Sequence, residues 1–222
     1  MNSGCRYRHD HAKAGGLLCV VGGRTVPDDN VIQEVDCYDP KTDVWTVMGN
    51  WTDNPTSDAV AMGYKDVFFV AGGYNPDYTR TTKVIAFNVT SRTWDSSPPS
   101  MAHARGDTQV AQLGDYYYVA GGYDYFNINT TVYYPNSTVM NTSATVCNFP
   151  THYMERFEPA TRTWTSEASM RYGRGDLAMG TIGNYVFSVA GETYTLDGYC
   201  NLSLPVNVVE RFNQTSQTWY AL

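Results

Sequence analysis

VFFVAGG at residues 67–73 and VIAFNVTSRTW at residues 84–94 are the two pieces of sequence that decide the fold of this chain. The first is an apolar run of aromatic and β-branched residues closed by two glycines, which is typical of a buried strand that ends in a tight turn. In the second, Phe87 precedes Trp94 by seven positions, with turn-forming residues between them. The two pieces together predict a central strand followed by a hairpin.

Both pieces recur along the whole chain. The first returns as LLCVVGG (17–23), YYYVAGG (116–122) and VFSVAGE (186–192), and the second returns as VDCYDPKTDVW (35–45), MERFEPATRTW (154–164) and VERFNQTSQTW (209–219). The recurring residues are Gly22, Gly23, Gly72, Gly73, Gly121, Gly122, Gly191, Trp45, Trp94, Trp164 and Trp219. In the fourth copy we expect Gly191 to keep the first glycine and Glu192 to replace the second.

The spacing of the repeats predicts the architecture. The tryptophans lie 49, 70 and 55 residues apart, and a repeat near this length is that of a propeller blade of four short strands. We predict an all-β chain with one propeller region over 1–222 and blades at about 5–50, 51–100, 101–168 and 169–222. Because a single blade cannot bury both of its faces, each tryptophan is expected between neighbouring blades.

The glycine pair, the aromatic residue seven positions before the tryptophan, and the spacing between them resemble the kelch repeat over nearly the whole chain. The resemblance implies a kelch-type β-propeller, a family that includes adaptors, receptors and a few enzymes. Kelch propellers typically close six or seven blades into a ring. We therefore expect a partial or open propeller that is part of a longer kelch protein, with a closed four-blade ring as the alternative.

Arginines recur at one phase of the repeat. Arg105 and Arg174 each begin an Arg-Gly-Asp triplet, and Arg8 matches them if one turn is two residues shorter. In kelch propellers that capture peptides, arginines at this phase line the mouth of the central pocket, so the resemblance implies partner contacts for these three residues. Each could pair with a carboxylate of the partner. The open alternative is that these arginines and the neighbouring aspartates brace the turns between blades.

A long insertion distinguishes the third blade. Residues 123–152 are rich in Tyr, Asn and Thr, and long loops on a rigid scaffold are common recognition sites. Tyr133 and Tyr134 are the candidate contact residues within it, because tyrosine offers a large contact area at low entropic cost. The alternative is a loop that carries glycans and has no recognition role.

Seven asparagines lie in N-x-[ST] sequons: Asn50, Asn88, Asn129, Asn136, Asn141, Asn201 and Asn213. This pattern favours an extracellular or secretory glycoprotein, although the segment shows no signal peptide and turn chemistry alone also uses Asn, Ser and Thr. Cys147 and Cys200, in equivalent extended loops, are the candidate disulfide. Cys19 and Cys37 are predicted to be buried thiols.

Composition restricts the function classes. The net charge of −7 argues against binding to nucleic acid, and the apolar runs are too short for membrane insertion within this segment. No catalytic residues, metal ligands or cofactor are predicted, since no nucleophile elbow, phosphate loop or CxxC pair is present. The sequence thus predicts a non-catalytic module that binds a protein or peptide through the propeller face and loops. The alternative is a kelch-type enzyme or carbohydrate-binding protein similar to galactose oxidase.

Overall fold

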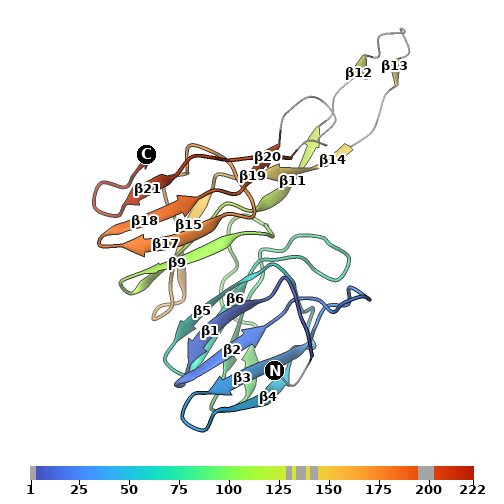
Figure 1. Cartoon of the computed structure of the whole chain (residues 1–222), viewed down its shortest axis with the longest axis vertical. Helices are drawn as coiled ribbons and strands as arrows, with labels where there is room; N and C mark the ends of the chain where they lie inside the picture. Colours follow the sequence, from blue (N-terminus) through green and yellow to red (C-terminus); the bar gives the residue numbers. More distant parts are fainter. Residues whose placement is uncertain (1–3, 129–131, 134–138, 141–144, 195–202) are drawn as a thin grey trace.

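The computed structural model describes residues 4–128, 132–133, 139–140, 145–194 and 203–222. The regular structure of these residues is entirely β, and it contains four four-stranded antiparallel sheets (Figure 1). This confirms the predicted fold class of four blades of four antiparallel strands. The described residues contain no helix with the length and apolar character that a membrane span requires.

Each blade follows the chain from its inner to its outer strand. The strands of blade one are β1 (Asp10–Ala14), β2 (Leu17–Val21), β3 (Glu34–Asp39) and β4 (Val44–Asn50), and those of blade two are β5 (Val60–Tyr64), β6 (Val67–Ala71), β7 (Val84–Asn88) and β8 (Thr93–Asp95). The strands of blade three are β9 (Gln109–Leu113), β10 (Tyr116–Ala120), β15 (Met154–Glu158) and β16 (Thr163–Ser166), and those of blade four are β17 (Ala178–Ile182), β18 (Tyr185–Val189), β21 (Glu210–Asn213) and β22 (Thr218–Ala221).

The four blades form an arc around an axis. Their first strands are adjacent in the order β1, β5, β9 and β17. In Figure 1 the first two blades, blue to teal, occupy the lower half of the molecule and the last two, green to red, the upper half. The described residues show no closure of the arc from β17 back to β1.

Apolar clusters join each blade to the next. Phe68 and Phe87 of blade two are fully buried against Cys19 and Val21 of blade one, and Phe69 of blade two packs on Phe157 of blade three with ring centroids 4.9 Å apart. Full burial of one such ring contributes roughly 1.5–3 kcal/mol. Alternate residues of one strand therefore serve two different interfaces, which explains why the central strands are apolar throughout.

The tryptophan of the repeat makes a polar link to the preceding blade. The indole N–H groups of Trp94, Trp164 and Trp219 donate to the backbone carbonyls of the preceding blade at 2.8–3.0 Å. The acceptors are those of Asn50, Pro99 and Ala168. Trp94 is only half-buried, and its ring lies 4.7 Å from that of Phe87. Each indole thus contributes both ring packing and one directional bond between blades.

The turn after the central strand differs from expectation in blade four. Backbone bridges pair Gly106 with Tyr123 and Gly175 with Glu192, so Glu192 is equivalent to Tyr123 and Gly191 takes the place of the second glycine. The first position is then Ala190, which has φ of 55°. At the equivalent Gly121, an added Cβ would lie 2.5 Å from the carbonyl oxygen of Arg174 in the next blade. Ala190 is exposed and is not constrained in this way.

The cysteines of blade one also differ from expectation. Cys19 and Cys37 are buried as predicted, but they form a disulfide and are not thiols. They face each other directly across β2 and β3, where the antiparallel register brings the two side chains together. Cys5 is a free, exposed thiol. The proposed pair Cys147 and Cys200 lies outside the residues whose side chains are described.

Short strands extend two blades beyond the repeat. Within the insertion, β11 (Tyr123–Ile128) pairs with β14 (Thr145–Pro150), and β12 (Val132–Tyr133) pairs with β13 (Val139–Met140). In blade four, β19 (Glu192–Tyr194) pairs with β20 (Ser203–Pro205) and contacts β14. The insertion predicted as a loop is therefore partly a ribbon that projects from the blades at the upper right of Figure 1.

Candidate functional site

One repeat position from every blade converges on the axis. The residues that follow the bridged positions Tyr7, Ser57, Gly106 and Gly175 all have left-handed φ values between 51° and 58°. They are Arg8, Asp58, Asp107 and Asp176. Together with His9, Asp10, Ala59, Thr108 and Gln109, they line a polar cavity of about 150 Å³, here called the axial pocket.

Arg8 and two aspartates form a compact cluster in this pocket. The Arg8 Nε donates to Asp58 Oδ1 at 2.8 Å, and Arg8 Nη2 lies 3.7 Å from Asp107 Oδ1. The Asp107 Oδ2 accepts a hydrogen bond of 2.8 Å from the Tyr74 hydroxyl. The side chains of Asp58 and Asp107 are only 6% and 10% exposed, whereas that of Arg8 is 33% exposed. Two carboxylates are thus buried beside one partly exposed cation.

The carboxyl groups influence each other's ionisation. Burial, followed by the hydrogen bond and charge of Asp58, raises the pKa of Asp107 to about 7. Partial burial, followed by the charge of Asp107, raises the pKa of Asp176. Burial opposes the charge of Arg8, but Asp58 and Asp107 outweigh it and raise the pKa of Arg8. Near neutral pH the Asp107 carboxyl group is therefore partly protonated.

The structure places Arg105 and Arg174 away from the axial pocket, contrary to the expectation drawn from the resemblance. Both side chains are fully buried inside their own blades. Arg105 Nη2 lies 2.6 Å from Glu155 Oε2, and Arg174 Nη2 lies 2.6 Å from Glu210 Oε2. Their other donors reach backbone carbonyls, such as that of Tyr153 at 2.9 Å. The two arginines brace the interior of their own blades, whereas the alternative had them bracing the turns between blades.

The equivalent residue in blade one is Arg6 and not Arg8. Arg6 is buried, and its Nη2 lies 2.6 Å from Asp36 Oδ2. The sequence alignment, which assumed a shorter turn, matched Arg8 with Arg105. The structure shifts this match by two residues, so that Arg6 is equivalent to Arg105 and Arg8 to Asp107. In blade two the arginine and the acid are both absent, and Thr56 and Ile85 stand in their places.

This joint presence or absence is the signal that could have identified the bracing pairs from the sequence. In blades one, three and four an arginine accompanies an acidic residue two positions before the third-strand aromatic, and in blade two both are replaced together. A buried arginine requires a buried acid, because either charge left alone is strongly destabilising.

The other predicted contact residues lie largely outside the described part of the chain. Tyr133 belongs to β12, but its side chain and the whole of Tyr134 are outside the description. Four sequon asparagines are also outside it: Asn129, Asn136, Asn141 and Asn201. Of the remaining three, Asn50 is exposed, whereas the side chains of Asn88 and Asn213 each accept backbone N–H bonds two residues ahead in a turn.

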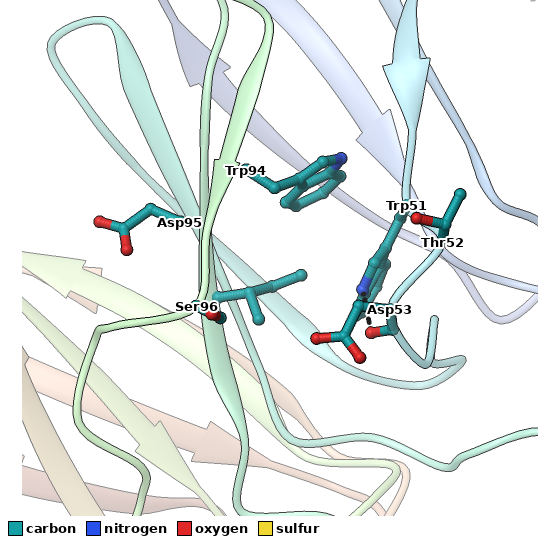
Figure 2. Close-up of a pocket in the computed structure, with 7 residues that line it drawn as sticks. Trp51, Thr52, Asp53, Trp94, Asp95 and Ser96 are labelled. Atoms are coloured by element: carbon teal, nitrogen blue, oxygen red, sulfur yellow. Dashed lines mark hydrogen bonds between the residues drawn. The ribbon is translucent and has the colours of Figure 1, made fainter.

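A second, smaller cavity lies between blades one and two. Trp51 and Trp94 flank it, with Asp53 and Asp95 at its edges, and its volume is about 60 Å³ (Figure 2). Trp51 Nε1 donates to the Asp53 carbonyl at 2.9 Å, and the two carboxylates pair with Lys83 and Arg162, each at 2.6 Å. Because these polar groups are already paired within the chain, the cavity offers a ligand little beyond ring faces.

Similarity to known proteins bears on the repeat and the fold. No family model matches the chain. Among curated proteins, the chain is 23% identical over 184 residues to Kelch-like protein 36 of Bos taurus and 26% identical over 192 residues to Kelch-like protein terF of Aspergillus terreus. Each alignment covers 82% of this chain. This is a kelch-repeat chain.

A solved structure described as that of YjhT superposes on this kelch-repeat chain with a TM-score of 0.74 at 14% identity, over 97% of this chain and 70% of the other. This likeness concerns the fold. The chain spans 26% of the length of the bovine relative and 37% of the fungal one. It is thus similar to one part of each of these longer proteins.

Proposed function

We propose that this chain is a non-catalytic kelch module that binds a protein or peptide at the axial pocket and the loops around it. The observation that supports this most is the convergence of Arg8, Asp58, Asp107 and Asp176, one residue from each blade, on a single polar cavity. A rigid scaffold that presents polar groups in a concave site is the usual setting for recognition.

Panning a random peptide library against the whole chain tests this proposal. Gln109 is exposed and lines the axial pocket, so Gln109→Trp should fill the pocket and reduce capture of the enriched peptides at least tenfold. Gln112→Trp is the matched control, because Gln112 lies on the same strand and lines a neighbouring cavity, which Gln109 also borders, but does not line the axial pocket. Equal capture by both variants would place binding elsewhere, and failure to enrich any peptide would count against a peptide-binding role.

One observation favours the alternative of an enzyme or carbohydrate-binding protein. A carboxyl group with a pKa near 7 beside a second carboxyl group is the arrangement that general acid–base catalysis uses. That alternative predicts saturable binding of a saccharide, with turnover lost in Asp107→Asn. Binding of peptides without turnover of any saccharide in a substrate panel would favour the binding module.

We also propose that the chain resides in the secretory pathway or outside the cell, as a glycoprotein. The Cys19–Cys37 disulfide supports this, because such bonds persist mainly in oxidising compartments, and the seven sequons add to it. Expression in a secreting eukaryotic host, followed by enzymatic deglycosylation, tests the proposal. We expect a loss of mass, with Asn50 as the most accessible of the described acceptors, and an unchanged mass would contradict glycosylation.

A further inference from the structure

We infer that the axial pocket receives a positively charged side chain of the partner, the ammonium group of a lysine or the guanidinium group of an arginine. This inference rests on the proposed binding function and adds the chemistry of the group that is bound. It reverses the expectation of an acidic partner, because that expectation depended on Arg105 and Arg174, which lie inside their blades.

The charges of the pocket favour a cation. Its lining contains the carboxyl groups of Asp10, Asp58, Asp107 and Asp176, and the one arginine among these residues is Arg8. Arg8 is already engaged, since its Nε lies 2.8 Å from Asp58 Oδ1. A second cation would therefore meet carboxylates whose charge Arg8 alone does not balance.

One buried carboxylate oxygen in the pocket has no N–H or hydroxyl donor. The Asp58 side chain is 6% exposed, its Oδ1 accepts from Arg8, and no such group of the described residues donates to its Oδ2. An unsatisfied acceptor on a buried charged group is costly, and a donor supplied by a ligand would remove this cost. The other available donor is the Asp107 carboxyl group in its protonated form, so a bound ammonium group would take the place of that proton.

Local backbone geometry does not require the carboxylates. Aspartate tolerates left-handed φ values, but asparagine does so equally well without adding charge. Arg8 has φ of 58°, so the repeat position accepts quite different side chains. Three neighbouring carboxyl groups at this position repel one another and cost stability, and such arrangements are enriched at functional sites.

The pocket dimensions suit the head group of one side chain. A polar cavity of about 150 Å³ has room for an ammonium or guanidinium group, with the rest of the peptide passing over the surrounding loops. The described residues contain no group of three potential ligands placed to hold a metal ion. The geometry is thus better matched to a donor-rich organic cation.

The test uses peptides enriched from the random library on the whole chain. The enriched peptides should share a lysine or arginine, and changing it to glutamine should weaken binding about tenfold or more, as expected for charge-assisted hydrogen bonds. Asp107→Asn should cause a similar loss, because the amide oxygen of the variant would still accept the Tyr74 hydroxyl but the side chain would carry no charge.

Two further variants complete the design. Asp176→Asn removes the charge of an exposed carboxyl group of the pocket, and it replaces Asp107→Asn as the test if that variant does not fold. Asp115→Asn is the control: Asp115 lies in the exposed turn between β9 and β10, so this variant should leave affinity unchanged. Enriched peptides that lack a shared cation, or whose affinity ignores both pocket variants, would overturn this inference and leave the binding function standing. Failure to enrich any peptide would overturn both.

Discussion

Replacing Arg105 by alanine would leave the Glu155 carboxylate inside blade three without its cation. Both side chains are at most 2% exposed, and their charged atoms lie 2.6 Å apart. The same substitution removes the donor to the Tyr153 carbonyl. We therefore expect Arg105→Ala to act on folding and not on partner contact.

The expected loss is about 3–5 kcal/mol, the range for breaking a buried ion pair by removing one partner. For a chain of this size it corresponds to a fall in melting temperature of roughly 6–20 °C. Blade two supplies the companion experiment, because it carries Thr56 and Ile85 where blade three has Arg105 and Glu155. The double variant Arg105→Thr with Glu155→Ile should regain most of the lost free energy of unfolding. A loss of about 1–2 kcal/mol should remain, because the Ala102 N–H now donates to Glu155 and would have no acceptor in the double variant.

The assay is equilibrium unfolding in denaturant at neutral pH. Arg171→Ala is the control, since its exposed side chain should change the free energy of unfolding by no more than about 0.5 kcal/mol. A loss below about 1 kcal/mol for Arg105→Ala would refute the bracing role. A double variant no better than the single one would show that the pair is not the source of the effect.

Three other substitutions test the fold and the pocket. Trp94→Ala should cost about 3–5 kcal/mol in denaturant unfolding, because it removes the inter-blade indole, and a loss no larger than that of the exposed Tyr220→Ala would contradict this. Ala190→Gly should stabilise the chain by about 1 kcal/mol, because residue 190 has a left-handed φ that glycine adopts without strain. Ala178→Gly, within β17, is the control and should destabilise the chain. Equal effects of the two variants would show that φ is not the cause. Asp107 has its pKa raised from 3.8 to about 7 when folded, so the free energy of unfolding should fall as pH rises from about 4 through 7. At about 1.4 kcal/mol per pKa unit, Asp107→Asn should gain on the order of 4 kcal/mol at pH 8 relative to its effect at pH 4. A difference that does not depend on pH would argue against the buried carboxyl group.

The fold could be predicted from the sequence because its determinants are local and repeated. An aromatic residue precedes a tryptophan by seven positions in every copy, as Phe87 precedes Trp94. A strand signal that appears four times in phase leaves few alternative architectures. The glycine turns were predicted equally well in the first three blades. Ala190 was missed because a non-glycine residue at left-handed φ gives no signal in a single sequence.

The site was harder to predict because it depends on which side chain of a triplet points inward. In Arg105-Gly106-Asp107 the arginine turns into its own blade and the aspartate turns to the axis, and the letters alone do not distinguish these directions. The Cys19–Cys37 disulfide was missed for a related reason, since it requires the register between β2 and β3. Both features depend on which residues face each other across neighbouring strands.

Hydrogen–deuterium exchange of the whole chain, with and without an enriched peptide, tests most directly whether the axial pocket is the binding site. The account predicts slower exchange at residues 7–10, 57–60, 106–109 and 175–178, which enter the pocket from the four blades. Protection confined to the outer hairpins at 40–43, 89–92, 159–162 and 214–217, with the axial segments unchanged, would contradict it.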